Sequence, residues 1–213
     1  MFEKEYLERL YQVLKNLVDA VKQIPGCSVE DEESSDKYQN VPMTDSDWEL
    51  VAFHEIGHAI VARVLYKNVI LEEINLGETT GGYKGCNIIT SKVNMLKKSD
   101  FLDEIAFLLG GMSAEDLVYG EHSAGCYGDL VEAKKTIKYM LNDCGMGKRL
   151  SYSEDYTELI DEEMELILQQ QLTRAKKVIK DNSDVLVCMQ KELVAKRKLS
   201  QEQINQLFEG FGI

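Results

Sequence analysis

The stretch Val51–Ile60, VAFHEIGHAI, decides how the rest of the sequence is interpreted. It places His54 and His58 four residues apart, with Glu55 directly after the first histidine. Helical residues advance by about 100° each, so the two imidazoles differ by roughly 40° around the axis and project from one face. Both then reach a single zinc ion at about 2.0–2.1 Å. Glu55 lies at the edge of that face, close enough to take a proton from water beside the metal.

This HExxH spacing is typical of zinc peptidases, in which the glutamate acts as general base. The same three positions also occur by chance, and the alternative is a semi-exposed helix with two histidines and Glu55 as a surface charge. The apolar Ile56 and Ile60 and the small Gly57 and Ala59 indicate that this part of the helix is buried. Because unpaired histidines and a glutamate are costly to bury, we favour metal binding.

A catalytic zinc ion usually has three protein ligands and one open position, so one ligand must come from elsewhere. The chain offers several candidates downstream of the helix, namely Glu115, Asp116, Glu121, His122 and Asp129. Spacing alone does not choose among them. Asp129 also has a structural interpretation, because Glu132 follows three positions later in the layout of a helix N-cap with its capping box.

Hydrophobic periodicity predicts a mainly α-helical fold with a small β-sheet near the active site. Thr44, with Asp47 three positions on, has the layout of a capping box and begins a helix expected over about 45–67. A β-leaning region follows, with the segments VILEEINLG and GGYKGCNIIT. We predict that Gly85, Cys86, Asn87 and Ile88 form a strand edge onto which a substrate strand adds. The alternative is a strand that is paired internally.

The second half of the chain is expected to be helical. One helix is predicted over about 99–119, and its Gly110-Gly111 pair indicates close packing against a neighbour. A further helix begins near Asp129 and is closed by Gly145. Two more follow from about residue 161, broken near Asp181-Asn182, and Ser200 begins a short last helix.

The chain divides into three predicted parts. Residues 1–25 form an N-terminal amphipathic helix, in which a near-heptad stripe of apolar residues stops at Pro25. Residues 26–44 form an acidic linker, and residues 45–213 form the main domain. The apolar stripe has to be covered, either by the main domain or by a second copy of the helix.

Composition limits the cellular setting and the partners. A formal net charge of −13 argues against nucleic acid and anionic membranes as partners. Five scattered cysteines without CxxC spacing favour reduced thiols in the cytoplasm. No apolar run approaches the roughly 18 residues of a membrane span, and no GxxxxGK[ST] nucleotide loop occurs. We expect a cytoplasmic protein without a membrane span.

Several ordered blocks of the sequence resemble a known family. VAFHEIGHAIVARVL and DEIAFLLGGMSAEDLVYGEHSAGCYGDLVEAKKTIKYMLNDCGM are similar to the peptidase domain of the FtsH-type AAA+ zinc proteases. The corresponding family blocks run approximately HEAGHA, LLGGRAAEE, STGAxNDL and a helix ending in YGM. The likeness covers roughly residues 48–208 and implies an FtsH-like zinc peptidase fold. It implies that Asp129 is the third zinc ligand and that Glu115 is a candidate partner for the N–H of a ligand histidine. The alternative for Glu115 is an ordinary carboxylate on the surface or in the first turn of a helix.

The resemblance also shows departures that bear on function. Met112 and Gly128 stand where the family has arginine and asparagine, and the family's transmembrane segment and ATP-driven unfoldase have no counterpart in this sequence. We therefore expect a zinc-dependent endopeptidase that cleaves polypeptides without ATP or with a separate ATPase partner. Because the family forms hexamers, self-association into a homo-oligomer stays open. The alternative is a zinc-containing binding or regulatory module with little or no proteolytic activity.

Overall fold

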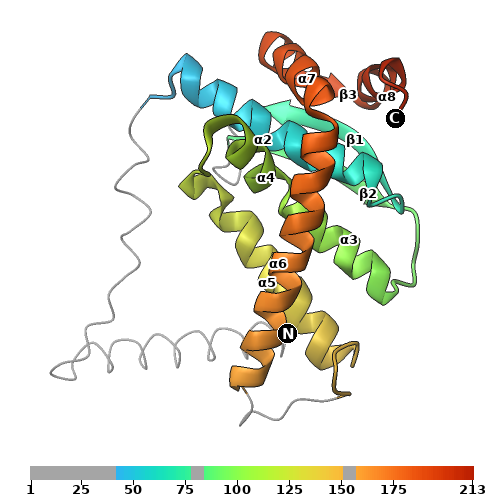
Figure 1. Ribbon diagram of the computed structural model, residues 1–213. Helices are drawn as coiled ribbons and strands as arrows, with labels where there is room; N and C mark the ends of the chain where they lie inside the picture. Colours follow the sequence, from blue (N-terminus) through green and yellow to red (C-terminus); the bar gives the residue numbers. More distant parts are fainter. Residues whose placement is uncertain (1–41, 78–83, 151–156) are drawn as a thin grey trace, which may run out of the picture. The chain divides into compact units, whose positions relative to one another are not determined.

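One long helix, α2 (Asp45–Val64), runs through the centre of the structure, with the other helices and a small sheet around it (Figure 1). The computed structural model describes residues 42–77, 84–150 and 157–213. The helix predicted over 1–25 and most of the linker predicted over 26–44 lie outside the described residues. Within them, the mainly helical fold with a small β-sheet is confirmed.

The start of α2 is the predicted capping box. The Thr44 amide donates to Asp47 Oδ2 (2.7 Å), and the Asp47 amide donates to Thr44 Oγ1 (3.2 Å). The helix packs against both sheet and helices, so all residues from His54 to Ala62 are buried. A helix that is covered on all sides belongs to the core. Its polar residues in this segment are therefore held in the interior of the domain.

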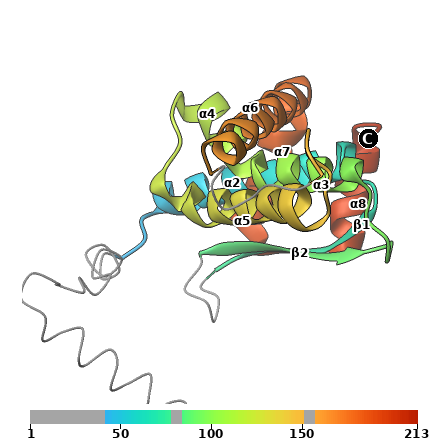
Figure 2. The same ribbon diagram turned by 90° about the horizontal axis from the view of Figure 1, so that it is seen from below.

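The sheet is antiparallel and has the strand order β2-β1-β3. Strands β1 (Val69–Leu76) and β2 (Gly85–Ser91) are the β-leaning segments predicted from the sequence. Strand β3 (Lys198–Ser200) joins β1 from far along the chain and was not predicted. Figure 2 shows the sheet as one layer, with α2 and the other helices on one side of it.

The hydrogen bonds of β1 show which main-chain groups of β2 are free. In an antiparallel ladder, successive residues point their main-chain groups to opposite neighbours. The Leu76 amide donates to Arg197 O on the β3 side (2.8 Å), and the Gly77 amide donates to Lys84 O on the β2 side (2.9 Å). With Asn75 paired to Cys86 in the register, the main chain of Cys86 faces β1. The main-chain groups of Gly85 and Asn87 therefore face the outer edge of β2, which pairs with no strand in the described residues.

The single helix predicted over 99–119 is wrong, because two helices occupy this segment. Helix α3 (Lys98–Leu108) is followed by its C-cap Leu109, where ψ is 3°, and α4 (Gly110–Tyr119) begins directly afterwards. The close packing predicted for the glycine pair is confirmed. A Cβ on Gly110 would lie 2.8 Å from the Gly57 carbonyl oxygen, and one on Gly57 would lie 2.5 Å from that of Gly110. The break lets the start of α4 touch the backbone of α2.

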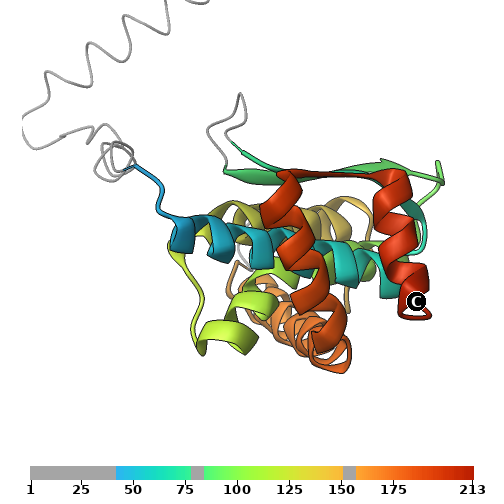
Figure 3. The ribbon, with the colours of Figure 1, turned by 90° about the horizontal axis from the view of Figure 1, so that it is seen from above.

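The remaining helices largely follow the prediction. Helix α5 (Tyr127–Lys138) continues into a π-helical turn (Tyr139–Asp143), and Gly145 follows with φ 61°. Helices α6 (Thr157–Asp181) and α7 (Ser183–Lys196) are separated at Asn182 as expected, and Ser200 caps α8 (Gln201–Gly210). Figure 3 shows how α7, β3 and α8 bring this last part of the chain to α2 and the sheet. Among the described helices, none has the length and apolar character that crossing a membrane requires.

Candidate metal centre

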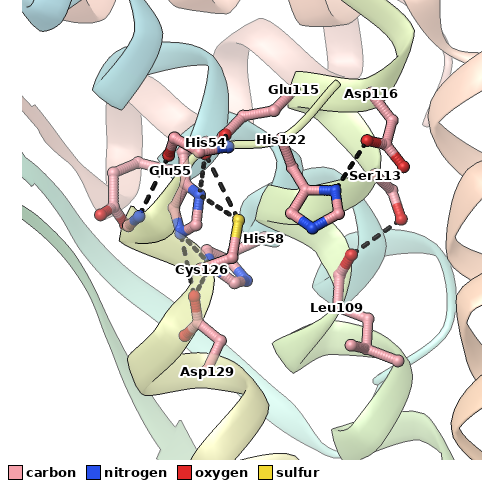
Figure 4. A network of polar contacts seen from close by, with 12 residues as sticks. His54, Glu55, His58, Leu109, Ser113, Glu115, Asp116, His122, Cys126 and Asp129 are labelled. Atoms are coloured by element: carbon pink, nitrogen blue, oxygen red, sulfur yellow. Dashed lines mark hydrogen bonds and ion pairs between the residues drawn. The ribbon is translucent and has the colours of Figure 1, made fainter. Parts of the chain in front are cut away.

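Two helices bring three potential ligands together. His54 and His58 project from α2, and Asp129 projects from the first turn of α5 (Figure 4). His54 Nε2 lies 3.0 Å from both His58 Nε2 and Asp129 Oδ2, and His58 Nε2 lies 3.3 Å from Asp129 Oδ2. Two imidazoles and one carboxylate therefore converge on a single point.

The outer nitrogens of both imidazoles fix which nitrogen faces this point. His54 Nδ1 lies 2.7 Å from Glu115 Oε1, and His58 Nδ1 lies 2.7 Å from the carbonyl oxygen of Phe107. A carbonyl and a carboxylate only accept hydrogen bonds, so each Nδ1 carries a hydrogen. In the neutral imidazole, each Nε2 then presents a lone pair. Two lone pairs and the Asp129 carboxylate oxygen face one another, and such a set repels itself unless a cation lies between its members.

The residues fit a zinc ion by donor type and by spacing. Two imidazole nitrogens and one carboxylate oxygen form a common set of protein ligands for catalytic zinc. Tetrahedral ligands at about 2.0–2.1 Å from zinc lie roughly 3.3 Å from one another. The three distances between ligand atoms here are 3.0, 3.0 and 3.3 Å. Little movement separates this arrangement from coordination.

The pKa values of Asp129 and His54 in the metal-free protein also indicate that positive charge is favourable at this point. Burial alone raises the pKa of Asp129, but the charge of His58 and the hydrogen bond to His54 outweigh it and hold the pKa well below its usual range. Burial alone lowers the pKa of His54, but its contacts with Asp129, Cys126 and Glu115 outweigh burial and raise the pKa well above 6.5. Both shifts favour positive charge at the point where the three side chains meet.

Glu115 connects His54 to the segment that precedes α5. Its side chain is buried, and its second oxygen accepts a hydrogen bond from the Ser123 amide (2.5 Å). The Cys126 thiol lies 3.6 Å from the first oxygen. Burial raises the pKa of Glu115, but the hydrogen bonds from His54 and Ser123 reverse this and lower it. The carboxylate is thus kept ionised against the histidine.

The absence of a side chain at Gly111 leaves room for the His54 ring. A Cβ there would lie 2.4 Å from Cε1 and 2.5 Å from Nε2 of His54. The sequence indicated close packing at this glycine pair, but it did not identify the histidine as the neighbour.

Glu55 lies between the metal centre and β2. Its carboxylate is buried, and burial raises its pKa, although the charges of His58 and His54 act in the opposite direction. Asn87 Nδ2 donates to Glu55 Oε2 (2.7 Å) and to the Glu55 carbonyl oxygen (2.9 Å). The sequence analysis assigned Asn87 only to a substrate edge and missed this contact.

Comparison with known proteins places these residues in a family. The model of Peptidase family M41 matches residues 41–152, which include the whole metal centre and Glu55. The chain belongs to peptidase family M41. This family membership confirms the resemblance stated from the sequence.

Several relatives of the chain carry the name "ATP-dependent zinc metalloprotease FtsH". The chain is 32% identical over 192 residues to FtsH 1 of Thermoanaerobacter sp., an alignment that covers 79% of this chain and 31% of that protein. FtsH 2 of the same organism is 28% identical over 181 residues, with coverages of 81% and 35%. FtsH of Mycoplasma genitalium is 29% identical over 184 residues, with coverages of 76% and 26%. The chain thus spans about a third of the length of the curated relatives it matches.

Three other ligand candidates of this M41 domain lie outside the His54–His58–Asp129 group, namely Asp116, Glu121 and His122. His122 Nδ1 lies 3.0 Å from Asp116 Oδ1, and Asp116 Oδ2 forms an ion pair with Lys176 (2.7 Å). Glu121 is exposed. The alternative that Asp129 caps a helix is wrong, because α5 already begins at Tyr127.

A cavity of about 510 Å³ leads to the metal centre. Its walls are the inner end of β2 (Gly85, Cys86, Asn87), the start of α5 (Gly128, Asp129, Glu132) and an apolar side formed by Leu50, Val51, Phe107 and Leu108. Another cavity, of about 650 Å³, lies between the end of α2, β1 and α8 and contains none of the metal-centre residues. The metal centre and Glu55 therefore line a cavity between β2 and α5.

Proposed function

We propose that this chain is a zinc-dependent endopeptidase with its active site in the groove between β2 and α5. The observation that carries the proposal is the convergence of His54, His58 and Asp129 with Glu55 beside them. Membership of peptidase family M41 and the zinc metalloprotease names of the relatives support it.

His54, His58 and Asp129 would hold the zinc ion. When bound, zinc supplies Lewis acidity that polarises a carbonyl group and makes water more acidic. Glu115 and the Phe107 carbonyl keep hydrogens on the outer nitrogens and orient the rings, as partners of ligand histidines commonly do. The protein thus points both Nε2 atoms toward the proposed zinc position before any metal binds.

Glu55 would act as general base and then as general acid. Its carboxylate accepts a proton from the attacking water as the new carbon–oxygen bond forms. It then delivers that proton to the leaving nitrogen as the carbon–nitrogen bond breaks. Burial favours the neutral form of Glu55 and so makes the protonated state accessible between the two steps.

A polypeptide substrate would add to the outer edge of β2 as an extended strand. Gly85 and Asn87 offer their main-chain groups to it, whereas those of Cys86 and Ile88 face β1. This assignment divides the four edge residues of the sequence prediction into two pairs with different roles. The apolar side of the groove suits an apolar substrate side chain next to the cleaved bond.

Hydrolysis at this site would not require ATP, because every group in the proposed chemistry belongs to the peptidase domain. The relatives are named as ATP-dependent, and we propose that a separate ATPase partner would serve only to unfold substrates. Flexible peptides should then be cleaved without nucleotide. Light scattering tests the homo-oligomer that the family resemblance leaves open, and cell fractionation tests the cytoplasmic location.

The experiment compares wild type with Glu55→Gln on casein and a labelled peptide library, with zinc content measured in parallel. Glu49→Gln is the matched control, because it makes the same change at an exposed position of the same helix. We expect zinc in all three proteins, full turnover in wild type and Glu49→Gln, and a loss of about 10²–10⁴-fold in Glu55→Gln. Zinc binding without turnover in any of them would instead favour the binding or regulatory module.

A further inference from the structure

Both hydrogen bonds of the Asn87 side chain are made to Glu55. Its amide nitrogen donates to both the carboxylate and the main-chain oxygen of Glu55, at 2.7 and 2.9 Å. The main-chain oxygen only accepts hydrogen bonds, so the orientation of the amide is settled by chemistry. If the amide were turned over, its oxygen would face two oxygens of Glu55 that can only accept hydrogen bonds. Asn87 therefore fixes both the position of the Glu55 carboxylate and the distance between β2 and α2 at this point.

This arrangement leaves the other half of the Asn87 amide without a partner. Asn87 Oδ1 is buried and accepts no hydrogen bond from any described residue. A buried acceptor without a partner is unfavourable for folding, and such groups call for an explanation in terms of function or strain. If Asn87 served only to join β2 to α2, a side chain without this unpartnered oxygen would give a more stable fold. The cost is explained if the donor half is needed at Glu55.

Gly85 contributes from the same face of the strand. Side chains alternate along a strand, so positions 85 and 87 point to the same side. A Cβ on Gly85 would lie 2.6 Å from Glu55 Oε1 and 2.7 Å from its Cγ. The Glu55 side chain thus occupies the space that a side chain at position 85 would fill. Gly85 leaves room for the Glu55 carboxylate, and Asn87 donates a hydrogen bond to it.

We propose that Asn87 is the positioning residue for Glu55, and that β2 couples the binding of a substrate strand to the orientation of the base. The proposal rests on the proposed function. The main-chain groups of Gly85 and Asn87 face the outer edge of β2, where the substrate strand would pair, while their inner face holds Glu55. A substrate strand that pairs with this edge would restrain β2, and it would thereby restrain the Glu55 carboxylate that receives the proton.

Kinetics of Asn87→Ala and Asn87→Asp test the positioning role. The aspartate variant keeps the volume of the side chain and replaces the donor by an oxygen that repels Glu55. Asn75→Ala is the matched control, because Asn75 lies on the neighbouring strand and donates to Glu73 (2.8 Å) instead. On a labelled peptide, we expect kcat to fall about 10–100-fold in both Asn87 variants, with KM within about twofold of wild type. Asn75→Ala should match wild type.

A measurement that does not depend on activity separates this proposal from the proposed function. Crystal structures of zinc-loaded wild type and Asn87→Asp should show the Glu55 carboxylate turned away from β2 in the variant, with the three ligands unmoved. If Glu55 keeps its place, or if KM rises while kcat is unchanged, the positioning role is overturned. Should wild type bind zinc and cleave nothing, the peptidase assignment fails, and the crystal comparison still decides the role of Asn87.

Discussion

Replacing Gly111 by alanine places a methyl group against His54, a proposed zinc ligand, and its effect follows from the distances. The added Cβ would lie 2.4 Å from Cε1 of His54, whereas ordinary contact begins at 3.4 Å. The ring or the backbone of α4 therefore has to move by about 1 Å. Zinc sites tolerate departures of about 0.2 Å in ligand distance, so this displacement is several times too large for the ion to remain fully coordinated.

The expected magnitude combines a stability effect and a metal effect. Alanine is a better helix former than glycine by about 1 kcal/mol, but overpacking a full interior typically costs 1–3 kcal/mol. We expect a small net loss of stability in the metal-free protein. Because the strain is on a ligand, zinc affinity should fall about 10–100-fold, comparable to the loss of a residue that orients a ligand.

A competition titration with a zinc-binding dye measures this affinity, and circular dichroism checks the fold. Gly77→Ala is the matched control, because a Cβ at Gly77 has nothing within 4 Å. It should bind zinc as wild type does. The packing argument is refuted if Gly111→Ala folds and binds zinc with wild-type affinity, because the ring would then have room that the structure does not provide.

Glu115→Ala should lower zinc affinity about 10–100-fold in the same titration, because the His54 ring loses its partner, whereas an unchanged affinity would show that Glu115 does not orient it. Zinc affinity should rise by up to about tenfold per pH unit through pH 6.5 until the pH passes the raised pKa of His54, because zinc must displace that proton; a flat profile around pH 6.5 would contradict this. In the metal-free protein the raised pKa of His54 adds stability that is present below about pH 6.5 and is lost as pH rises through the folded-state pKa. The lowered pKa of Asp129 adds stability that is present above about pH 3.8 and is lost as pH falls, so Asp129→Asn should flatten the acid side of a urea-unfolding series. Ile60→Ala, at a fully buried position, should cost about 2–5 kcal/mol in urea unfolding, and a cost below 1 kcal/mol would show that α2 is not the core helix.

The local parts of the site could be predicted from the sequence. The capping box of Thr44 and the histidine spacing depend on residues at most four positions apart, and a helix turns such spacing directly into geometry. Asp129 lies 75 residues from His54, and its place was taken from a family resemblance rather than from spacing. The residues alone did not distinguish Asp129, as the third ligand, from His122 and three other acidic candidates.

The parts that were missed depend on tertiary packing. The end of α3 at Leu109 follows from the contact of Gly110 with the backbone of α2, which no local pattern reports. Strand β3 is only three residues long and forms because β1 offers it an edge. The contact between Asn87 and Glu55 joins positions 32 residues apart on different elements. In a strand segment, asparagine alone gives no sign of such a role.

The ligand set itself can be measured directly in crystals of the zinc-loaded wild-type protein, by anomalous diffraction at the zinc absorption edge. We predict one strong peak per chain, within about 2.0–2.2 Å of His54 Nε2, His58 Nε2 and a carboxylate oxygen of Asp129. A peak elsewhere on the chain, or one at the two histidines with Asp129 turned away, would contradict the metal centre described here.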